Sequence, residues 1–172
     1  MEQNPMKYYL ESMGCQMNTA DSQLLASELE KLGHHATPQM DEADILVENF
    51  RPDVKHRLGI DYDTLAAVRP ELVYASISGF GQDGPYADLP GFDQIAQGMG
   101  GLMSITGAPG GGPMRVGIPI ADLTSGLYCA LGILVALLHR EATGRGQWVK
   151  TSLLEAQVAM LDFQAARWLI EG

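Results

Sequence analysis

Asp122 is the residue whose setting points most directly to chemistry. It lies in a stretch, residues 112–126, in which small residues lead into a long apolar run. This pattern predicts that a helix begins near Asp122, where the helix amides and dipole would keep the carboxylate ionised. An ionised carboxylate beside glycines can attack an acyl group and form a covalent intermediate. Because Asp is also a favoured N-cap residue, the spacing alone leaves a purely structural role open.

A second group of candidate residues follows a short apolar segment, residues 44–47, that is predicted to be a buried strand. Asn49, Phe50 and Arg51 come directly after it, and Arg57 lies six residues beyond Arg51. Ligands of open α/β sheets bind at the carboxyl ends of strands. Arg51 and Arg57 could hold phosphate groups, and Phe50 could cover an adenine or a pantetheine arm. Arginines near strand ends are also common on solvated surfaces, so this group alone is a weak signal.

Composition limits the classes of protein that this chain can belong to. It has 172 residues, 46% of them hydrophobic, and a formal net charge of -10, as expected of one globular domain or two small ones. The acidic balance argues against nonspecific nucleic-acid binding. Two distant cysteines, Cys15 and Cys129, cannot build a disulfide framework or a four-cysteine metal site, so we expect no metal and a cytoplasmic location. The longest apolar run, residues 126–138, is about two-thirds of a membrane span and predicts a buried helix, not a membrane protein.

The predicted elements alternate between short strands and helices, which is typical of an α/β fold. We expect a Rossmann-like open, mostly parallel sheet with flanking helices. The predicted strands are residues 7–12, 44–47, 72–77 and 148–151. The predicted helices are residues 19–32, 54–58, 61–68, 92–103, 122–143 and 152–168.

Four motifs together resemble the family III CoA-transferases. They are residues 43–52 (ADILVENFRP), 72–86 (LVYASISGFGQDGPY), 120–126 (IADLTSG) and 137–147 (LLHREATGRGQ). The resemblance covers about residues 41–172, and the chain would be an incomplete domain of this family. It implies that Asp122 is the catalytic carboxylate, which accepts the acyl group and then CoA as an aspartyl thioester. It also implies that Asn49, Phe50, Arg51 and Arg57 lie along the CoA, and that the protein is a homodimer.

Gly91, Phe92 and Asp93 distinguish between two activities of this family. The related acyl-CoA racemases carry a histidine before the aspartate of this motif, as an acid/base partner. A phenyl ring cannot exchange a proton, so the sequence favours CoA transfer over racemisation.

The first forty residues resemble another family. Residues 7–22 (KYYLESMGCQMNTADS) and 42–47 (EADILV) are similar to the amino-terminal domain of radical-SAM methylthiotransferases that modify tRNA. In that family the cysteine matching Cys15 is one of three ligands of an iron-sulfur cluster. Phe50 and Arg51 stand near the place of the second ligand and no third exists, so a cluster is not expected.

These observations predict two segments, residues 1–40 and 41–172, joined near residues 42–49. The predicted function is transfer of CoA between an acyl-CoA and a small carboxylic acid, and the sequence leaves open whether the truncated, chimeric chain is active or inactive by itself. The alternative is a noncatalytic protein whose amino-terminal segment binds tRNA or a partner protein. The charge disfavours that alternative, because Lys7 and Lys31 are the sole lysines or arginines before Asp44.

Overall fold

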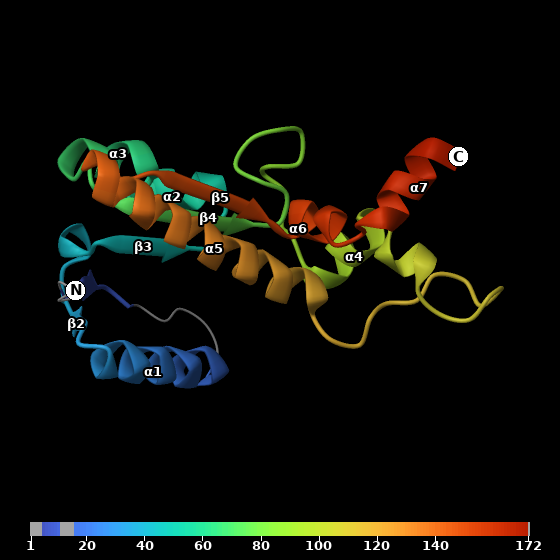
Figure 1. Ribbon diagram of the computed structural model, residues 1–172, viewed down its shortest axis with the longest axis horizontal. Coiled ribbons are helices and arrows are strands. Elements are labelled where there is room, and N and C mark those ends of the chain that lie inside the picture. The colour runs from blue at the N-terminus through green and yellow to red at the C-terminus, as the bar shows by residue number, and fades with distance from the viewer. Residues whose placement is uncertain (1–4, 11–15, 172) are drawn as a thin grey trace.

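The computed structural model describes residues 5–10 and 16–171, which form one open sheet with helices on both faces (Figure 1). The sheet has five strands in the order β2-β1-β3-β4-β5, and all neighbouring strands are parallel. The strands are β1 Lys7–Tyr8, β2 His35–Ala36, β3 Ile45–Glu48, β4 Val73–Ser78 and β5 Trp148–Ser152. The predicted fold class is confirmed.

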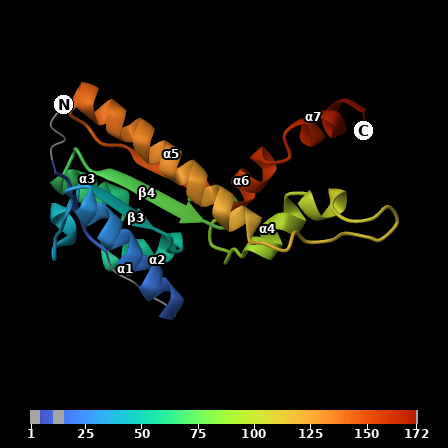
Figure 2. The same ribbon diagram turned by 60° about the horizontal axis from the view of Figure 1, so that its bottom comes forward.

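Seven α-helices and two short 3-10 helices connect the strands in the described part of the chain. The α-helices are α1 Gln16–Lys31, α2 Pro52–Leu58, α3 Tyr62–Val68, α4 Asp93–Met99, α5 Ile120–Thr143, α6 Leu153–Ala159 and α7 Phe163–Glu171. The 3-10 helices are η1 Met40–Glu42 and η2 Leu102–Ile105. Helix α5 crosses one face of the sheet, whereas α2 and α3 lie against the other (Figures 1 and 2).

Successive side chains of each strand point to opposite faces of the sheet, so the sheet packs against a helical layer on each face. On the face of α3, Leu46 and Tyr74 form a buried cluster with Tyr62 and Trp148. The Tyr62 and Trp148 rings stack with their centroids 5.3 Å apart. On the face of α5, a Cβ at Gly132 would lie 2.6 Å from Cγ1 of Val149, so the glycine allows the helix to approach β5 closely.

The last predicted helix is wrong in one respect, because two helices replace it. Its start is confirmed: the Ser152 side chain accepts a hydrogen bond from the Glu155 amide at 3.1 Å and donates one to the Glu155 carboxylate at 2.8 Å. The helix ends at Ala159, and Asp162 takes a left-handed conformation with φ 46° before α7 begins. Asp tolerates this conformation better than most residues, so the chain changes direction there.

Helix α5 is not the fully buried helix that the apolar run predicts. One face packs on the sheet, but a row of outward side chains is 53% to 68% exposed. The row consists of Leu123, Leu127, Leu131, Leu134, Val135 and Leu138. By length and composition, α5 is the one helix among the described residues that could cross a membrane, with 28% of its most apolar window buried. Core helices of soluble proteins meet the same criterion, so the expected absence of a membrane stays a prediction.

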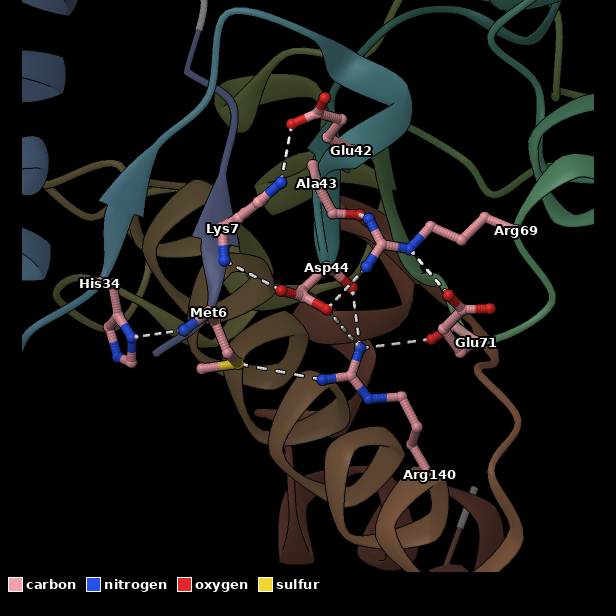
Figure 3. A network of polar contacts seen from close by, with 9 residues as sticks. All are labelled: Met6, Lys7, His34, Glu42, Ala43, Asp44, Arg69, Glu71 and Arg140. Atoms are coloured by element: carbon pink, nitrogen blue, oxygen red, sulfur yellow. Dashed lines mark hydrogen bonds and ion pairs between the residues drawn. The ribbon is translucent and has the colours of Figure 1, made fainter. Parts of the chain in front are cut away.

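The amino-terminal segment joins the sheet at the edge of β3, where Asp44 is the centre of a polar network (Figure 3). One carboxylate oxygen of Asp44 accepts a hydrogen bond from the Lys7 amide at 2.9 Å. The other lies 3.0 Å from Nη2 of Arg69 and 3.4 Å from Nη1 of Arg140, on α5. This carboxylate therefore connects β1 to the elements that follow β3.

Candidate functional site

Asp122 is the third residue of α5 and its side chain is exposed to solvent. The residue before the helix is Pro119, so the structural alternative left open by the spacing, in which Asp122 is only the N-cap, does not hold. The carboxylate that caps α5 comes instead from Asp93, the first residue of α4. Its Oδ1 accepts hydrogen bonds from the amides of Ala121 at 2.8 Å and Asp122 at 3.4 Å.

The pKa of Asp122 lies above the usual range for an aspartate. Partial burial of the carboxyl group raises the pKa, and the negative charge of Asp93 raises it further. Loss of hydration and the neighbouring carboxylate therefore oppose the stabilisation of the ionised form that we expected from the start of the helix. A carboxylate with reduced hydration and increased basicity is a better nucleophile once it has lost its proton.

Gln97 fixes the segment that leads to Asp122. Its buried amide nitrogen donates to Asp93 Oδ2 at 2.7 Å and to the Ile118 carbonyl at 3.3 Å. Its amide oxygen accepts from the Val116 backbone at 2.8 Å. The sequence distinguishes Asp93 only by the absence of a preceding histidine and gives no sign of its role as a cap. The hydrogen-bond partners lie 28 and 29 residues away, so no local spacing could have indicated it.

The second predicted group lies at the carboxyl end of β3, as expected from the strand and turn pattern. Asn49 and Arg51 are exposed, Phe50 is half-buried, and Arg57 is exposed on α2. Arg51 forms a half-exposed ion pair with Asp53, with Nε and Oδ1 3.2 Å apart. Such surface pairs contribute little free energy, so a phosphate group can compete for the Arg51 guanidinium.

The structure places the two predicted groups at the same end of the sheet but does not join them. α2 and α5 lie on opposite faces, and the loop formed by residues 79–92 projects at the carboxyl ends of the strands (Figure 1). Among the described residues, no hydrogen bond or ion pair connects Asp122 with residues 49–57. The loop is closed at its base by Gly79 and Gly91, where a Cβ on either would overlap the other's backbone. It connects β4 to Asp93, and through Asp93 to the start of α5.

An open apolar depression of about 650 Å³ lies along α4, the helix whose first residue, Asp93, caps α5. Its lining residues are Phe92, Gln94, Ile95, Gly98, Met99 and Met103. Phe92, which stands where the racemase histidine would be, is exposed there. The depression therefore offers an apolar surface that includes Phe92 and Gln94, the two sequence neighbours of Asp93.

The cysteine and metal predictions have different outcomes. Cys129 is buried on α5, and burial raises the pKa of its thiol. Cys15 lies outside the described residues. No group of three or more histidine, cysteine or acidic side chains is placed to hold a metal ion in the described segments. The expected absence of a metal and of an iron-sulfur cluster stays a prediction.

Comparison with known families identifies the larger part of the chain. Residues 35–172 match the model of CoA-transferase family III. The chain belongs to this family. Residues 7–50 match a second model, that of uncharacterized protein family UPF0004, and the two matches overlap over residues 35–50.

Several CoA-transferases and one solved structure are similar to this chain. A succinate–glutarate CoA-transferase of Agrobacterium fabrum is 47% identical over 130 residues, covering 76% of this chain and 32% of that protein. An acetyl-CoA:oxalate CoA-transferase of Acetobacter aceti is 46% identical over 132 residues, 76% of this chain and 34% of that protein. A CAIB/BAIF family protein from Brucella suis superposes with a TM-score of 0.72 at 42% identity, over 75% of this chain and 34% of that structure. The family III chain described here therefore spans about a third of the length of these relatives.

Proposed function

We propose that this chain carries part of a family III CoA-transferase site, in which Asp122 moves CoA between carboxylic acids through an aspartyl thioester. The observation that carries the proposal is the setting of Asp122. Within a segment that matches family III, its carboxylate is exposed, has a raised pKa and lies at the amino-terminal turn of α5 beside Asp93. An accessible and basic carboxylate is what attack on an acyl thioester requires.

The proposed reaction balances as two exchanges at Asp122. The carboxylate oxygen attacks the acyl carbon of acyl-CoA, and the C–S bond breaks. The CoA thiolate departs, and the acyl group remains on Asp122 as a mixed anhydride. The thiolate then attacks the Asp122 carbonyl carbon, which forms the aspartyl thioester and releases the donor as a carboxylate. The acceptor acid reverses these steps, and Asp122 returns to its starting state.

In this proposal Asn49, Phe50, Arg51 and Arg57 hold the CoA, which is a co-substrate. The exposed guanidinium groups of Arg51 and Arg57 can pair with its phosphates, and Phe50 can contact an apolar part. Arg51 lies just after the carboxyl end of β3, where open α/β sheets bind nucleotides, and Arg57 lies on α2, the helix that begins there.

The names of the relatives support a small carboxylic acid as the acyl group. The similar proteins from Agrobacterium fabrum and Acetobacter aceti are named for succinate and glutarate, and for acetyl-CoA and oxalate. We infer that the present chain acts on acids of this size. We also propose a cytoplasmic location, which is compatible with a chain whose two distant cysteines build no disulfide framework.

We also propose that the chain works as a homodimer. The exposed apolar row of α5 supports this proposal, because a soluble protein rarely leaves such a row uncovered. Sedimentation of the purified chain at several concentrations tests it. A dimer is the expected result, and a monomer at all concentrations would contradict the proposal.

Transfer of CoA from succinyl-CoA to glutarate tests the proposed function. We expect glutaryl-CoA to form with the unaltered chain, and none to form with Asp122→Asn. Asp88→Asn is the matched control, since Asp88 is an exposed aspartate in the loop between β4 and α4. Equal transfer by Asp122→Asn and Asp88→Asn would contradict the assignment of Asp122.

The second candidate function rests on the match of residues 7–50 to the uncharacterized family. We propose that this segment derives from the amino-terminal domain of a methylthiotransferase, which makes the chain a chimera. The described contacts argue against tRNA binding. Lys7 forms an ion pair with Glu42 at 2.8 Å, and Lys31 forms one with Glu28 at 2.6 Å, so both lysines already face carboxylates. Salt-dependent binding of tRNA by the chain would revive this candidate.

A further inference from the structure

Glu48 and Lys55 form a buried ion pair that the sequence analysis did not single out. Their side chains are 2% and 1% exposed, and Nζ of Lys55 lies 3.0 Å from Oε1 of Glu48. Charged side chains are rarely buried so completely unless they are paired, and replacing a buried ion pair by apolar residues is often neutral for stability. Stability alone therefore gives little reason for this pair.

Lys55 already uses its full set of hydrogen-bond donors inside the protein. Its ammonium group donates to Glu48, to Oγ of Ser76 at 3.2 Å, and to the side-chain oxygen of Gln82. An ammonium group has three donors, so these three acceptors satisfy it. Lys55 is therefore unlike Arg51 and Arg57, whose exposed side chains can reach a ligand.

The second oxygen of Glu48 determines the conformation of the turn that follows β3. Oε2 accepts a hydrogen bond from the Phe50 amide at 2.7 Å, two residues further along the chain. A carboxylate that folds back onto its own backbone in this way fixes the turn locally. The turn contains Asn49, Phe50 and Arg51.

Ser76 and Gln82 connect this turn to the rest of the site. Ser76, on β4, donates to Oε1 of Glu48 at 2.5 Å and accepts from Nε1 of Trp148, on β5, at 2.9 Å. Gln82 belongs to the loop between β4 and α4 that leads to Asp93. The buried pair therefore links β3, α2, β4, β5 and this loop.

We propose that Glu48 and Lys55 are positioning residues, which hold the turn at Asn49, Phe50 and Arg51 in the conformation that binds CoA. The inference rests on the proposed function, because it assigns CoA to that turn. A turn that is already fixed loses less conformational entropy on binding, so the pair acts on affinity without touching the ligand.

The test measures CoA affinity by calorimetry and the hydrogen-exchange rate of the Phe50 amide by NMR. The decisive variant is Glu48→Leu/Lys55→Met, because it removes both charges together and leaves neither one buried without a partner. In this variant the Phe50 amide has lost its acceptor. We expect its exchange to become about tenfold faster and the dissociation constant for CoA to rise about tenfold.

Asp63→Asn is the matched control, since Asp63 is an exposed acidic residue in the first turn of α3. It should change neither the exchange rate nor the affinity. Glu48→Gln is a milder variant with nearly the same volume. This variant is used if the double variant does not fold. Glutamine has one side-chain oxygen, which cannot occupy the positions of both Glu48 oxygens and so cannot accept from both the Phe50 amide and Lys55. We expect the same direction of change in both measurements.

The two measurements separate failure of this inference from failure of the proposed function. A folded variant that binds CoA with the affinity of the unaltered chain would overturn the positioning role, since a purely structural pair would give that result. If the unaltered chain binds no CoA, the proposed function fails. In that case, faster Phe50 exchange in the variants would still support a role of the pair in holding the turn.

Discussion

Removal of the Asp44 carboxylate should destabilise the chain more than removal of any exposed ion pair. Asp44→Ala takes the acceptor from the Lys7 amide and the counter-charge from Arg69 and Arg140. The three side chains Asp44, Arg69 and Arg140 are 20%, 22% and 18% exposed, so solvent screens them incompletely.

The magnitude follows from which partners remain. Arg69 keeps the Ala43 carbonyl at 2.8 Å and the Glu71 carboxylate at 3.1 Å, and Arg140 keeps the Glu71 carbonyl at 3.3 Å. Each hydrogen bond to a charged group contributes roughly 1.5 to 3 kcal/mol, and the partners that remain recover part of the loss. We therefore expect the free energy of unfolding to fall by about 2 to 4 kcal/mol. For a chain of this size, that lowers the melting temperature by roughly 5 to 15 °C.

Thermal unfolding followed by circular dichroism at neutral pH measures this effect. Lys31→Ala is the control, because it removes the exposed pair between Lys31 and Glu28 and should leave the melting temperature essentially unchanged. If Asp44→Ala had the same melting temperature as Lys31→Ala, Asp44 would not join the amino-terminal segment to the sheet as the structure shows.

Three further perturbations test local features of the structure. Ser152→Ala removes the N-cap of α6 and should cost about 1 kcal/mol in urea unfolding; an unchanged midpoint would contradict the cap. Gly146→Ala places a Cβ against the Leu72 carbonyl and should cost about 1 to 3 kcal/mol or more in the same assay, whereas a neutral result would mean that the strand edge moves freely. The folded-state pKa of Asp122 is raised, so ionisation of its carboxyl group opposes folding. The free energy of unfolding therefore rises as the pH falls through the folded-state pKa. Asp122→Asn should therefore raise the melting temperature at pH 7, with the difference disappearing in acid below the usual pKa of aspartate; a difference independent of pH would contradict the shift.

Much of the fold could be predicted because its signals are local. The apolar segments before Asn49 and before Gly79 have the length and composition of buried parallel strands, and the structure has β3 and β4 there. Ser152 and Glu155 carry a capping pattern within four residues, and α6 begins after Ser152. The break at Asp162 had no such signal, since Asp is compatible with both helix and turn.

The parts of the site that escaped prediction depend on contacts between distant segments. Asp93 caps a helix 28 residues further along, and Lys55 meets Ser76 and Gln82, which lie 21 and 27 residues away. A lysine in a short basic helix indicates a solvated surface, so its burial became evident only from the structure. The raised pKa of Asp122 has the same origin, because both of its causes, partial burial and then the Asp93 charge, arise through folding and not through sequence spacing.

The exposed row of α5 shows the limit of reasoning from composition. Its apolar run correctly predicted a helix, and the inference of complete burial failed because the described layers cover one of its faces. A hydrophobic pattern indicates that a surface avoids water, and it does not indicate which segment or partner covers it.

Trapping of the covalent intermediate tests the central claim most directly. The chain is incubated with succinyl-CoA, treated with hydroxylamine, digested and analysed by mass spectrometry. Hydroxylamine converts an aspartyl thioester or anhydride into a hydroxamate, so we predict this modification on Asp122 and on no other aspartate. A folded chain in which Asp122 remains unmodified after exposure to acyl-CoA would contradict the account.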